Sequence, residues 1–375
     1  SSEMKAQGVD VINMSVGEPD FMTPEPIKEA GKKAIDDNFS KYSPVPGYPA
    51  LRNAISKKLK AENGLDYAAS EIIVGTGGKQ GVCNAIMALV NPGDEVIIPA
   101  PYWVSYPQMV KLAGGNPVII SAGIEQDFKI TADQLEASIT PKTKMIILCS
   151  PSNPTGSVYT KAELDELAKV VISHEDVFVL SDEIYEHINY IGKHASIAAC
   201  PNMKERTIIC NGVSKAYAMT GWRLGWVAAP EWIVKGLNKL QGQYTSGTSS
   251  VSQMAALAAY EGNQQCVEDF RKTFQRRRDL IVNLAKGIPG LEVNIPQGAF
   301  YLFPKCSSFF GKSNGKYTIN NSTDLAMYLL EEGHVATVGG DDFGSPDCFR
   351  MSYATSDDNI KEALQRIKDA LSKLK

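Results

Sequence analysis

Short apolar runs alternate with stretches of helical periodicity between residues 71 and 229, and this alternation limits the folds that the chain can adopt. Helical patterns near 79–90, 103–113, 131–139 and 160–173 separate the earlier runs. The succession predicts an α/β fold with a mostly parallel sheet and helices on both faces. Ligands of such sheets lie at the carboxyl ends of the strands, so polar residues just after each run are candidate site residues. The runs are Ile72–Val74, Glu95–Ile98, Pro117–Ile120, Met145–Cys149, Val177–Leu180, Thr207–Cys210 and Leu224–Ala228.

A single lysine, Lys215, lies in the loop between the last two runs, among small and apolar neighbours. Poor solvation of its ammonium favours the neutral, nucleophilic form. Arg223 in the same loop offers a planar cation suited to a phosphate. A lysine that can form an imine, next to an anion-binding arginine, is what pyridoxal phosphate requires. The alternative is a surface lysine in a Gly/Ser turn, and on this pair alone the alternative carries more weight.

Other candidate residues follow earlier runs, and each has a structural alternative. Gly75–Gln80 opens a helix with free backbone N–H groups that could hold a phosphate, although it completes no nucleotide-binding pattern. Asp182 follows a strand and could cap the next helix. Asn153 lies in a Pro/Asn/Gly turn, and a tryptophan such as Trp103 is most often a core residue.

Two further candidates lie near the ends of the chain. Arg350 alternates with apolar residues in a strand pattern over 348–354. A buried arginine without a partner is costly, so we expect either a structural salt bridge or an anionic ligand. Gly17 lies in a Gly/Pro turn after a short apolar segment, where the missing side chain would let a ligand approach the backbone.

The loop around Lys215 resembles, position by position, the cofactor attachment signature of class I aminotransferases. The resemblance implies that Lys215 holds pyridoxal 5'-phosphate as an internal aldimine. It also implies that Arg223 binds the cofactor phosphate with help from the Ser214 hydroxyl, and that Gly78 and Lys79 donate backbone N–H groups to the same phosphate. The matching residues are Gly212, Ser214, Lys215, Ala218, Met219, Gly221, Arg223 and Gly225.

The same resemblance assigns the remaining contacts to the cofactor ring. Trp103, in the run Pro101–Trp103, would lie over the pyridine ring. Asn153 in the Asn-Pro-Thr-Gly motif and Tyr185 would contact the phenolic oxygen. Asp182 would pair with the protonated pyridine nitrogen and keep the ring cationic, so that it accepts electrons from the substrate Cα.

Substrate recognition is also implied by the resemblance. The backbone of Gly17, in a Gly-Glu-Pro-Asp-Phe motif, would meet the substrate carboxylate, which Arg350 would bind in a bidentate pair. Tyr42 would reach the cofactor phosphate of the neighbouring subunit, which implies a homodimer with shared active sites. The loop at 241–252 offers no Arg or Lys for an acidic substrate, so the side chain of Lys79 becomes the candidate for the distal carboxylate. A surface lysine on the first helical turn is the equally weighted alternative.

These motifs occur in family order from Gly17 to Arg350, and the resemblance covers nearly the whole chain. It predicts a fold-type I pyridoxal-phosphate transferase with a large domain at 36–285 and a small α+β domain formed by 1–35 and 286–375. The branch that it resembles comprises the bacterial aspartate aminotransferases, some of which accept prephenate. The expected reaction moves the amino group of L-aspartate to 2-oxoglutarate by a ping-pong mechanism, with Lys215, Asp182 and Tyr185 as catalytic residues.

Composition and charge limit the kinds of molecule that the protein is expected to bind. A net charge of −4 suggests neither a nucleic-acid nor a membrane partner, and no run of about 18 apolar residues exists. The seven cysteines are scattered, which predicts reduced thiols in a cytoplasmic protein, and neither they nor the four histidines show metal-ligand spacing. The basic run Arg276–Arg278 is interpreted as a solvated helix face. The first residues are Ser-Ser, which predicts that an N-terminal segment has been removed or left out.

Two alternatives to aspartate transamination stay open. One is another enzyme on the same scaffold, such as a prephenate, alanine or aromatic aminotransferase or a pyridoxal-phosphate lyase. The other is a non-enzymatic regulator that carries an aminotransferase-like domain. A regulator of this kind should also carry a DNA-binding module, and the sequence shows no helix-turn-helix extension or basic domain.

Overall fold

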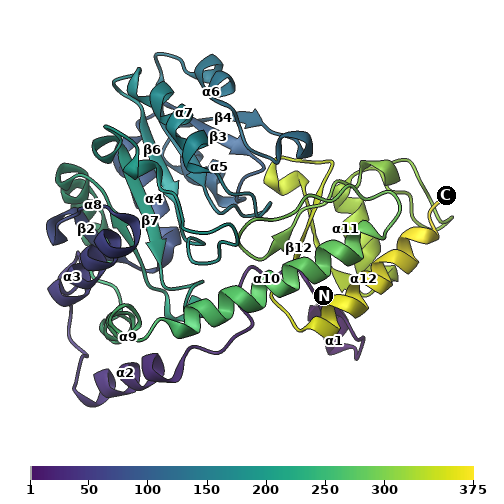
Figure 1. Ribbon diagram of the computed structural model, residues 1–375, viewed down its shortest axis with the longest axis horizontal. Helices are drawn as coiled ribbons and strands as arrows, with labels where there is room; N and C mark the ends of the chain where they lie inside the picture. The colour runs from purple at the N-terminus through teal and green to yellow at the C-terminus, as the bar shows by residue number, and fades with distance from the viewer. Residues whose placement is uncertain (1) are drawn as a thin grey trace.

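A computed structural model gives the structure of residues 2–375, in which a large mixed sheet lies beside a smaller group of strands and helices (Figure 1). The large sheet has seven strands in the order β2-β8-β7-β6-β5-β3-β4. All pairs are parallel except those of β8, which runs antiparallel to β7 and β2. The prediction of a mostly parallel sheet is therefore confirmed. The strands are β2 (Ile72–Gly75), β3 (Glu95–Ala100), β4 (Asn116–Ser121), β5 (Thr143–Cys149), β6 (Phe178–Asp182), β7 (Thr207–Gly212) and β8 (Gly225–Ala228).

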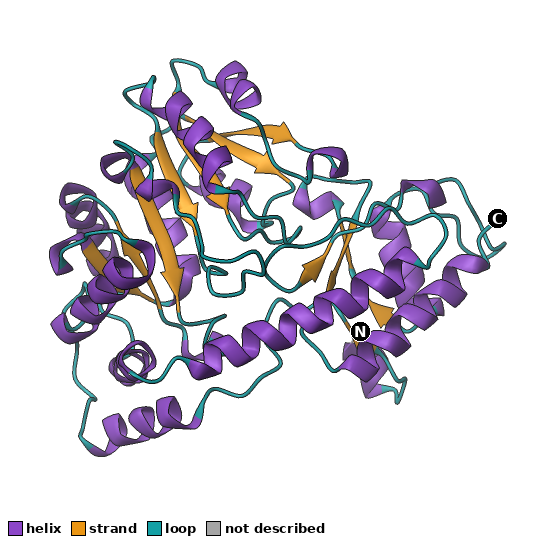
Figure 2. Cartoon of the chain, in the orientation of Figure 1, coloured by secondary structure: helices purple, strands orange, loops and turns teal. Residues whose placement is uncertain are grey.

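Helices cover both faces of this sheet (Figure 2). Successive strand residues point to opposite faces, so Met145 and Ile147 pack on one side while Ile146 and Leu148 pack on the other. This is why the strands appear in the sequence as continuous apolar runs. The first face is covered by α4 (Gly77–Leu89), α5 (Ser105–Leu112) and α8 (Glu231–Tyr244). The second face is covered by α3 (Pro49–Lys58), α6 (Ala132–Ser138), α7 (Lys161–Ile172) and α9 (Ser250–Glu261).

The smaller part combines segments from the two ends of the chain. Its antiparallel sheet has the order β11-β12-β9, and β1 pairs in parallel with β10. The amide of Ser352 donates to the carbonyl of Met14 at 2.7 Å and joins the two groups of strands. The strands are β1 (Ile12–Asn13), β9 (Tyr301–Leu302), β10 (Val335–Ala336), β11 (Val338–Gly339) and β12 (Phe349–Ser352). The remaining helices are α1 (Ser2–Ala6), α2 (Glu25–Asp36), α10 (Gln265–Lys286), α11 (Ser322–Glu332) and α12 (Asp357–Ser372).

Only two residues of the mostly apolar segment 298–303 form a strand, namely β9. Ala299 has a φ of 54°, in the left-handed region, which interrupts an extended chain. The amides of Gly298 and Ala299 donate to the carbonyls of Gly156 and Ile188, which lie outside the small sheet. These bonds tie the segment to the loops of the large sheet instead of to a strand partner.

The interpretation of Arg276–Arg278 as a solvated helix face is wrong for two of the three residues. Arg277 is buried and forms a bidentate pair with Asp20, at 2.7 and 2.9 Å. Arg278 donates to the carbonyl of Pro296 at 2.6 Å. Only Arg276 has a largely exposed side chain. Successive residues on a helix point in different directions, so a basic run places part of its charge against the protein.

The first residues of the chain contact both parts of the molecule. Strand β1 belongs to the smaller part, whereas α2 packs against α9 of the larger part. In Figure 1, α2 lies beside α9 at the edge of the molecule. The predicted boundaries at 36–285, 1–35 and 286–375 stay a prediction. Across residues 2–375, every helix is too short or too polar to cross a membrane.

Candidate active site

A cavity of about 510 Å³ opens at the carboxyl ends of the central strands, between the large sheet and the smaller part. Asp182 ends β6, and Lys215 and Asn153 follow β7 and β5 in the loops beyond. Arg350 enters the cavity from β12. All residues predicted to form the site line this cavity except Tyr42: they are Gly17, Gly78, Lys79, Trp103, Asn153, Asp182, Tyr185, Ser214, Lys215, Arg223 and Arg350.

Lys215 points into this cavity from the loop that joins two antiparallel strands. Gly212 and Gly225 face each other in these strands, and a side chain on either would collide with neighbouring backbone. The Lys215 Nζ donates to the carbonyl of Gly17 at 2.5 Å. Removal from water lowers the pKa of the Lys215 ammonium to about 8; the nearby acid Glu18 opposes this shift. About a tenth of Lys215 is therefore a neutral amine at pH 7, far more than for a solvated lysine.

Asp182 is a buried carboxylate on the cavity wall. Its Oδ2 accepts a hydrogen bond from the Tyr106 Oη at 2.6 Å, and its Oδ1 accepts from the Ile184 amide at 3.3 Å. Burial raises the pKa of Asp182, although both hydrogen bonds act in the opposite direction. The nearby Lys215 ammonium also lowers it, and a buried carboxylate of this kind is suited to a cationic ligand. Sequence reasoning missed the role of Tyr106, because a tyrosine on the first turns of a helix gives no signal of what its hydroxyl reaches.

One end of the cavity is suited to a phosphate. The N-terminus of α4 presents Gly78 there, and Ser214 and Arg223 line the same cavity, with Arg223 close to Gly77. Backbone N–H groups and the helix dipole at such an end favour an anion. A side chain on Gly77 would lie 2.3 Å from the Arg223 Nη2, and one on Gly225 would lie 2.3 Å from the Gly78 amide. Both positions therefore require glycine for the arginine and the helix end to approach.

The other end of the cavity is suited to a carboxylate. Arg350 is only 7% exposed, its Nη1 donates to the Asn153 Oδ1 at 2.8 Å, and its Nη2 donates to the Ser15 carbonyl at 2.6 Å. Its Nε has no hydrogen-bond partner. Among the ion pairs of residues 2–375, Arg350 has no carboxylate partner. The structural salt bridge considered from the sequence is thus absent from the described residues, and a buried cation of this kind is suited to an anionic ligand.

Aromatic and cationic side chains complete the wall. The Lys79 Nζ lies 4.9 Å from the centre of the Trp103 ring, and Trp103 meets Tyr106 edge-on. The Tyr185 hydroxyl lies 2.7 Å from that of Tyr301. The cavity therefore holds a nucleophilic lysine, a buried carboxylate and two anion-binding ends.

Comparison with known proteins agrees with this arrangement. Residues 9–367 match the family model described as aminotransferase class I and II. The chain belongs to this aminotransferase family. An aspartate/prephenate aminotransferase of Cereibacter sphaeroides is 49% identical over 97% of this chain and 92% of its own length. A Petunia hybrida enzyme, named bifunctional aspartate aminotransferase and glutamate/aspartate-prephenate aminotransferase, is 49% identical over 98% of this chain and 78% of its own length.

Solved structures of aminotransferases superpose closely on this chain. The aspartate aminotransferase of Rhizobium meliloti has a TM-score of 0.96 and 46% identity, and the match covers 100% of this chain and 94% of that one. The aspartate aminotransferase of Thermus thermophilus with maleate has a TM-score of 0.92 and 40% identity, covering 98% and 94%. The predicted fold class and the family resemblance are confirmed.

Tyr42 lies outside the cavity of its own aminotransferase chain. It is 96% exposed, and Met22 and Ile35 in the neighbouring N-terminal segment are also largely exposed. An aromatic side chain with so little cover within its own chain is compatible with the predicted contact to a second subunit. That contact stays a prediction.

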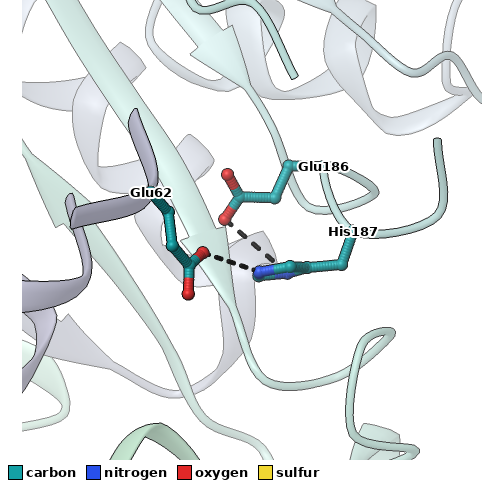
Figure 3. A group of neighbouring side chains, drawn as sticks. All are labelled: Glu62, Glu186 and His187. Atoms are coloured by element: carbon teal, nitrogen blue, oxygen red, sulfur yellow. Dashed lines mark hydrogen bonds and ion pairs between the residues drawn. The ribbon is translucent and has the colours of Figure 1, made fainter. Parts of the chain in front are cut away.

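Figure 3 shows a second group of ionisable side chains, Glu62, Glu186 and His187, which are not among the residues that line the cavity. The His187 Nε2 is 2.8 Å from the Glu62 Oε2, and its Nδ1 is 3.8 Å from the Glu186 Oε1. Such a group resembles a cation site, but the Lys58 ammonium already contacts Glu186. Burial alone would raise the pKa of Glu186, yet Lys58 and the nearby histidines hold it well below its usual range. The Glu186 carboxylate is thus already paired with a protein cation.

Proposed function

We propose that this chain is a pyridoxal-phosphate-dependent aspartate aminotransferase, which transfers the amino group of L-aspartate to 2-oxoglutarate. One observation carries the proposal: a lysine with a pKa of about 8 shares a single cavity with a buried aspartate and with a buried arginine that has no carboxylate partner among the described residues. The names of relatives at 49% identity support aspartate as the donor.

The residues of the cavity fit the cofactor. Gly78, Ser214 and Arg223 would hold its phosphate, and Asp182 would pair with its ring nitrogen. Trp103 would cover the ring, while Asn153 and Tyr185 would approach its phenolic oxygen. When bound, the cofactor supplies an electron sink for the electrons released at the substrate Cα. Burial alone raises the pKa of Asp182 and disfavours its charged form. A cationic ring nitrogen would offset this effect, because it stabilises the ionised carboxylate.

The chain itself supplies proton transfer and orientation. The Lys215 amine, whose pKa is lowered to about 8, would take the proton from the substrate Cα and return it as general base and acid. Arg350 would fork the α-carboxylate and fix the Cα above the lysine. The backbone of Gly17 would meet the substrate carboxylate, and this proposal is supported by the Gly17 carbonyl, which accepts from the Lys215 amine at 2.5 Å.

Lys79 would read the distal carboxylate of the substrate. Its ammonium lies over the Trp103 ring on the cavity wall and is therefore held near the bound molecule. The Thermus thermophilus relative was solved with maleate, a dicarboxylate. Prephenate also carries two carboxylates, and it is named as a substrate of the Cereibacter sphaeroides relative, so prephenate transamination is the second candidate function.

We further infer a homodimer in the cytoplasm, with Tyr42 of each subunit directed toward the cofactor phosphate of the other. The 96% exposure of Tyr42 supports this assignment, since the residue has little to contact within its own chain.

A half-reaction tests the function. The purified protein, loaded with pyridoxal phosphate, is mixed with one amino acid at a time in the absence of an oxo acid, and the change in the cofactor spectrum is followed. We expect fast conversion with aspartate and glutamate and slow conversion with alanine or phenylalanine. Fast conversion with neutral donors would support an aminotransferase but exclude aspartate as its preferred donor. A protein that binds no cofactor would refute the proposal.

A further inference from the structure

Tyr301 occupies a central position behind the active site, and none of the roles described above involves it. It is the first residue of β9 and is fully buried. Its hydroxyl lies 2.7 Å from the Tyr185 hydroxyl. A side chain on Gly17 would lie 2.8 Å from the same oxygen, so the glycine leaves room for it. The Arg350 guanidinium lies 4.7 Å from the centre of the Tyr301 ring.

Within the part of the chain that the structure describes, the cavity wall includes Tyr185 but not Tyr301. Tyr301 therefore lies behind the cavity wall, where its contacts are with its protein neighbours. The Tyr185 ring is held edge-on by Phe300 at 5.5 Å and by Tyr301 at 5.8 Å, which fixes the direction of its hydroxyl.

We propose that Tyr301 is a positioning residue that donates its hydroxyl proton to the Tyr185 oxygen, so that the Tyr185 proton is directed to the phenolic oxygen of the cofactor. This inference rests on the proposed function, because it assumes that pyridoxal phosphate binds beside Tyr185. In this arrangement Tyr301 determines how strongly the Tyr185 hydroxyl donates to the cofactor oxygen.

The direction of the hydrogen bond follows from the surrounding charge. Each phenol has one proton, and burial raises the pKa of both, so both stay protonated. The Arg350 cation lowers the pKa of both phenols, but it lies against the Tyr301 ring and acts more strongly there, which favours Tyr301 as the donor. An oxygen that accepts a hydrogen bond becomes a stronger donor in turn, because successive hydrogen bonds polarise one another.

The consequence concerns the ionisation of the lysine-bound cofactor. A donor at the phenolic oxygen stabilises its anionic form and lowers the pH at which the visible absorption band titrates. Without the Tyr301 hydroxyl, Tyr185 becomes a weaker donor. The midpoint of that titration should then rise.

The test is the Tyr301→Phe variant, which keeps the ring against Arg350 and removes only the hydroxyl. The cofactor-loaded protein is titrated without substrate, and we expect the midpoint to rise by about half to one pH unit, a threefold to tenfold change in the proton dissociation constant. A Tyr353→Phe variant is the matched control, since Tyr353 is equally buried and its hydroxyl donates to the Ala299 carbonyl at 3.2 Å. This control should titrate like the unmodified protein.

A double variant decides whether Tyr301 acts through Tyr185. In a Tyr185→Phe background, the Tyr301→Phe change should add no further shift. An unchanged midpoint in Tyr301→Phe, or an equal shift in both backgrounds, would overturn the inference. If Tyr301→Phe does not fold, Gly17→Ala crowds the same hydroxyl and should raise the midpoint in the same direction. Absence of a visible band in the unmodified protein would instead refute the proposed function.

Discussion

The acidity of one residue, Lys215, should govern how the protein acquires its cofactor. Only the neutral amine attacks the aldehyde of pyridoxal phosphate, and burial lowers the pKa of this ammonium to about 8. We expect the rate of covalent attachment to the apoprotein to rise with pH and to level off above a midpoint near 8. Stopped-flow absorbance of the apoprotein mixed with excess cofactor measures this rate.

The same shift affects the stability of the apoprotein. In the unfolded chain a lysine keeps its proton up to a pKa of about 10.4. Between pH 8 and that value the unfolded state binds more protons, so the unfavourable contribution of Lys215 is largest below pH 8 and decreases as the pH rises through this window. A midpoint near 10 in the attachment rate would show that the ammonium is well solvated and would contradict both statements.

Lys79 should determine the preference for acidic substrates. A Lys79→Ala variant removes the ammonium over Trp103, and we expect kcat/KM for aspartate to fall by about 10- to 100-fold. Alanine has no distal carboxylate, so its kcat/KM should change little and serves as the control within the same protein. Steady-state assays with both donors measure the two values. Full activity of the variant with aspartate would assign the distal carboxylate to another residue.

Sequence motifs located most of the residues that line the cavity, because the motifs occur in a recognisable order and several of them follow strand ends. They did not reveal Tyr106 or Tyr301, whose hydroxyls reach Asp182 and Tyr185. Their contribution depends on side-chain direction across elements far apart in the sequence, and tyrosine in a buried strand or helix is ordinary core composition. The free Nε of Arg350 likewise became visible only when its surroundings were known.

Elements of the fold are held together behind the site by the buried pair of Lys58 on α3 and Glu186, which follows β6. Asn211 at the end of β7 donates to the same Glu186 carboxylate at 2.8 Å and accepts from the Gly212 amide at 2.7 Å. The pair therefore links α3 to the strands that lead to Tyr185 and Lys215.

A Lys58→Met variant should strongly destabilise the protein. Both side chains of the pair are only 4% exposed, so the change leaves a buried carboxylate without its cation and should cost about 3–5 kcal/mol. Urea unfolding of the apoprotein measures the loss. The double variant Lys58→Met, Glu186→Gln should recover part of it. Lys33→Met, which removes an exposed pair with Asp37, is the matched control and should cost at most about 1 kcal/mol.

The contribution of Glu186 to the stability of the folded protein should persist until the pH is very low. Its pKa in the folded protein lies below its usual range, so its contribution is present at neutral pH and is lost only as the pH falls through the folded value. His194 behaves in the opposite way, because burial would lower its pKa but Glu183 raises it. The contribution of protonated His194 to folding stability is complete below about pH 6.5, and it is lost as the pH rises through the pKa of His194 in the folded protein. A Lys58→Met protein as stable as the original would contradict this account of the pair.

The large sheet could be predicted from the sequence because its strands are buried on both faces and separated by helices of regular periodicity. The smaller part was harder to predict, since β10 and β11 have only two residues each and give no pattern. The left-handed Ala299 and the buried Arg277 depend on contacts with Gly156, Ile188 and Asp20, which are distant in sequence. Local propensity carries no information on such contacts.

At the scale of the whole molecule, Tyr42 should serve the active site of the neighbouring subunit. If it binds the cofactor phosphate across a dimer interface, Tyr42→Phe should weaken cofactor affinity by about tenfold, the loss of one hydrogen bond to a charged group. Sedimentation analysis should still give a dimer, since one hydroxyl is small against a complete interface. Equilibrium titration of the apoprotein with pyridoxal phosphate measures the affinity.

A hybrid dimer separates the two possible placements of Tyr42. One subunit carries Tyr42→Phe and keeps Lys215, while the other carries Lys215→Ala and keeps Tyr42. If the tyrosine acts across the interface, the only site with a lysine also receives an intact Tyr42, so the hybrid binds cofactor covalently with the original affinity. If Tyr42 acts within its own chain, the site with the lysine lacks its hydroxyl and the affinity stays as weak as in Tyr42→Phe. A weak affinity in the hybrid would contradict the shared site. The cavity that keeps Lys215 is otherwise unchanged, so its affinity depends only on which chain supplies the Tyr42 hydroxyl.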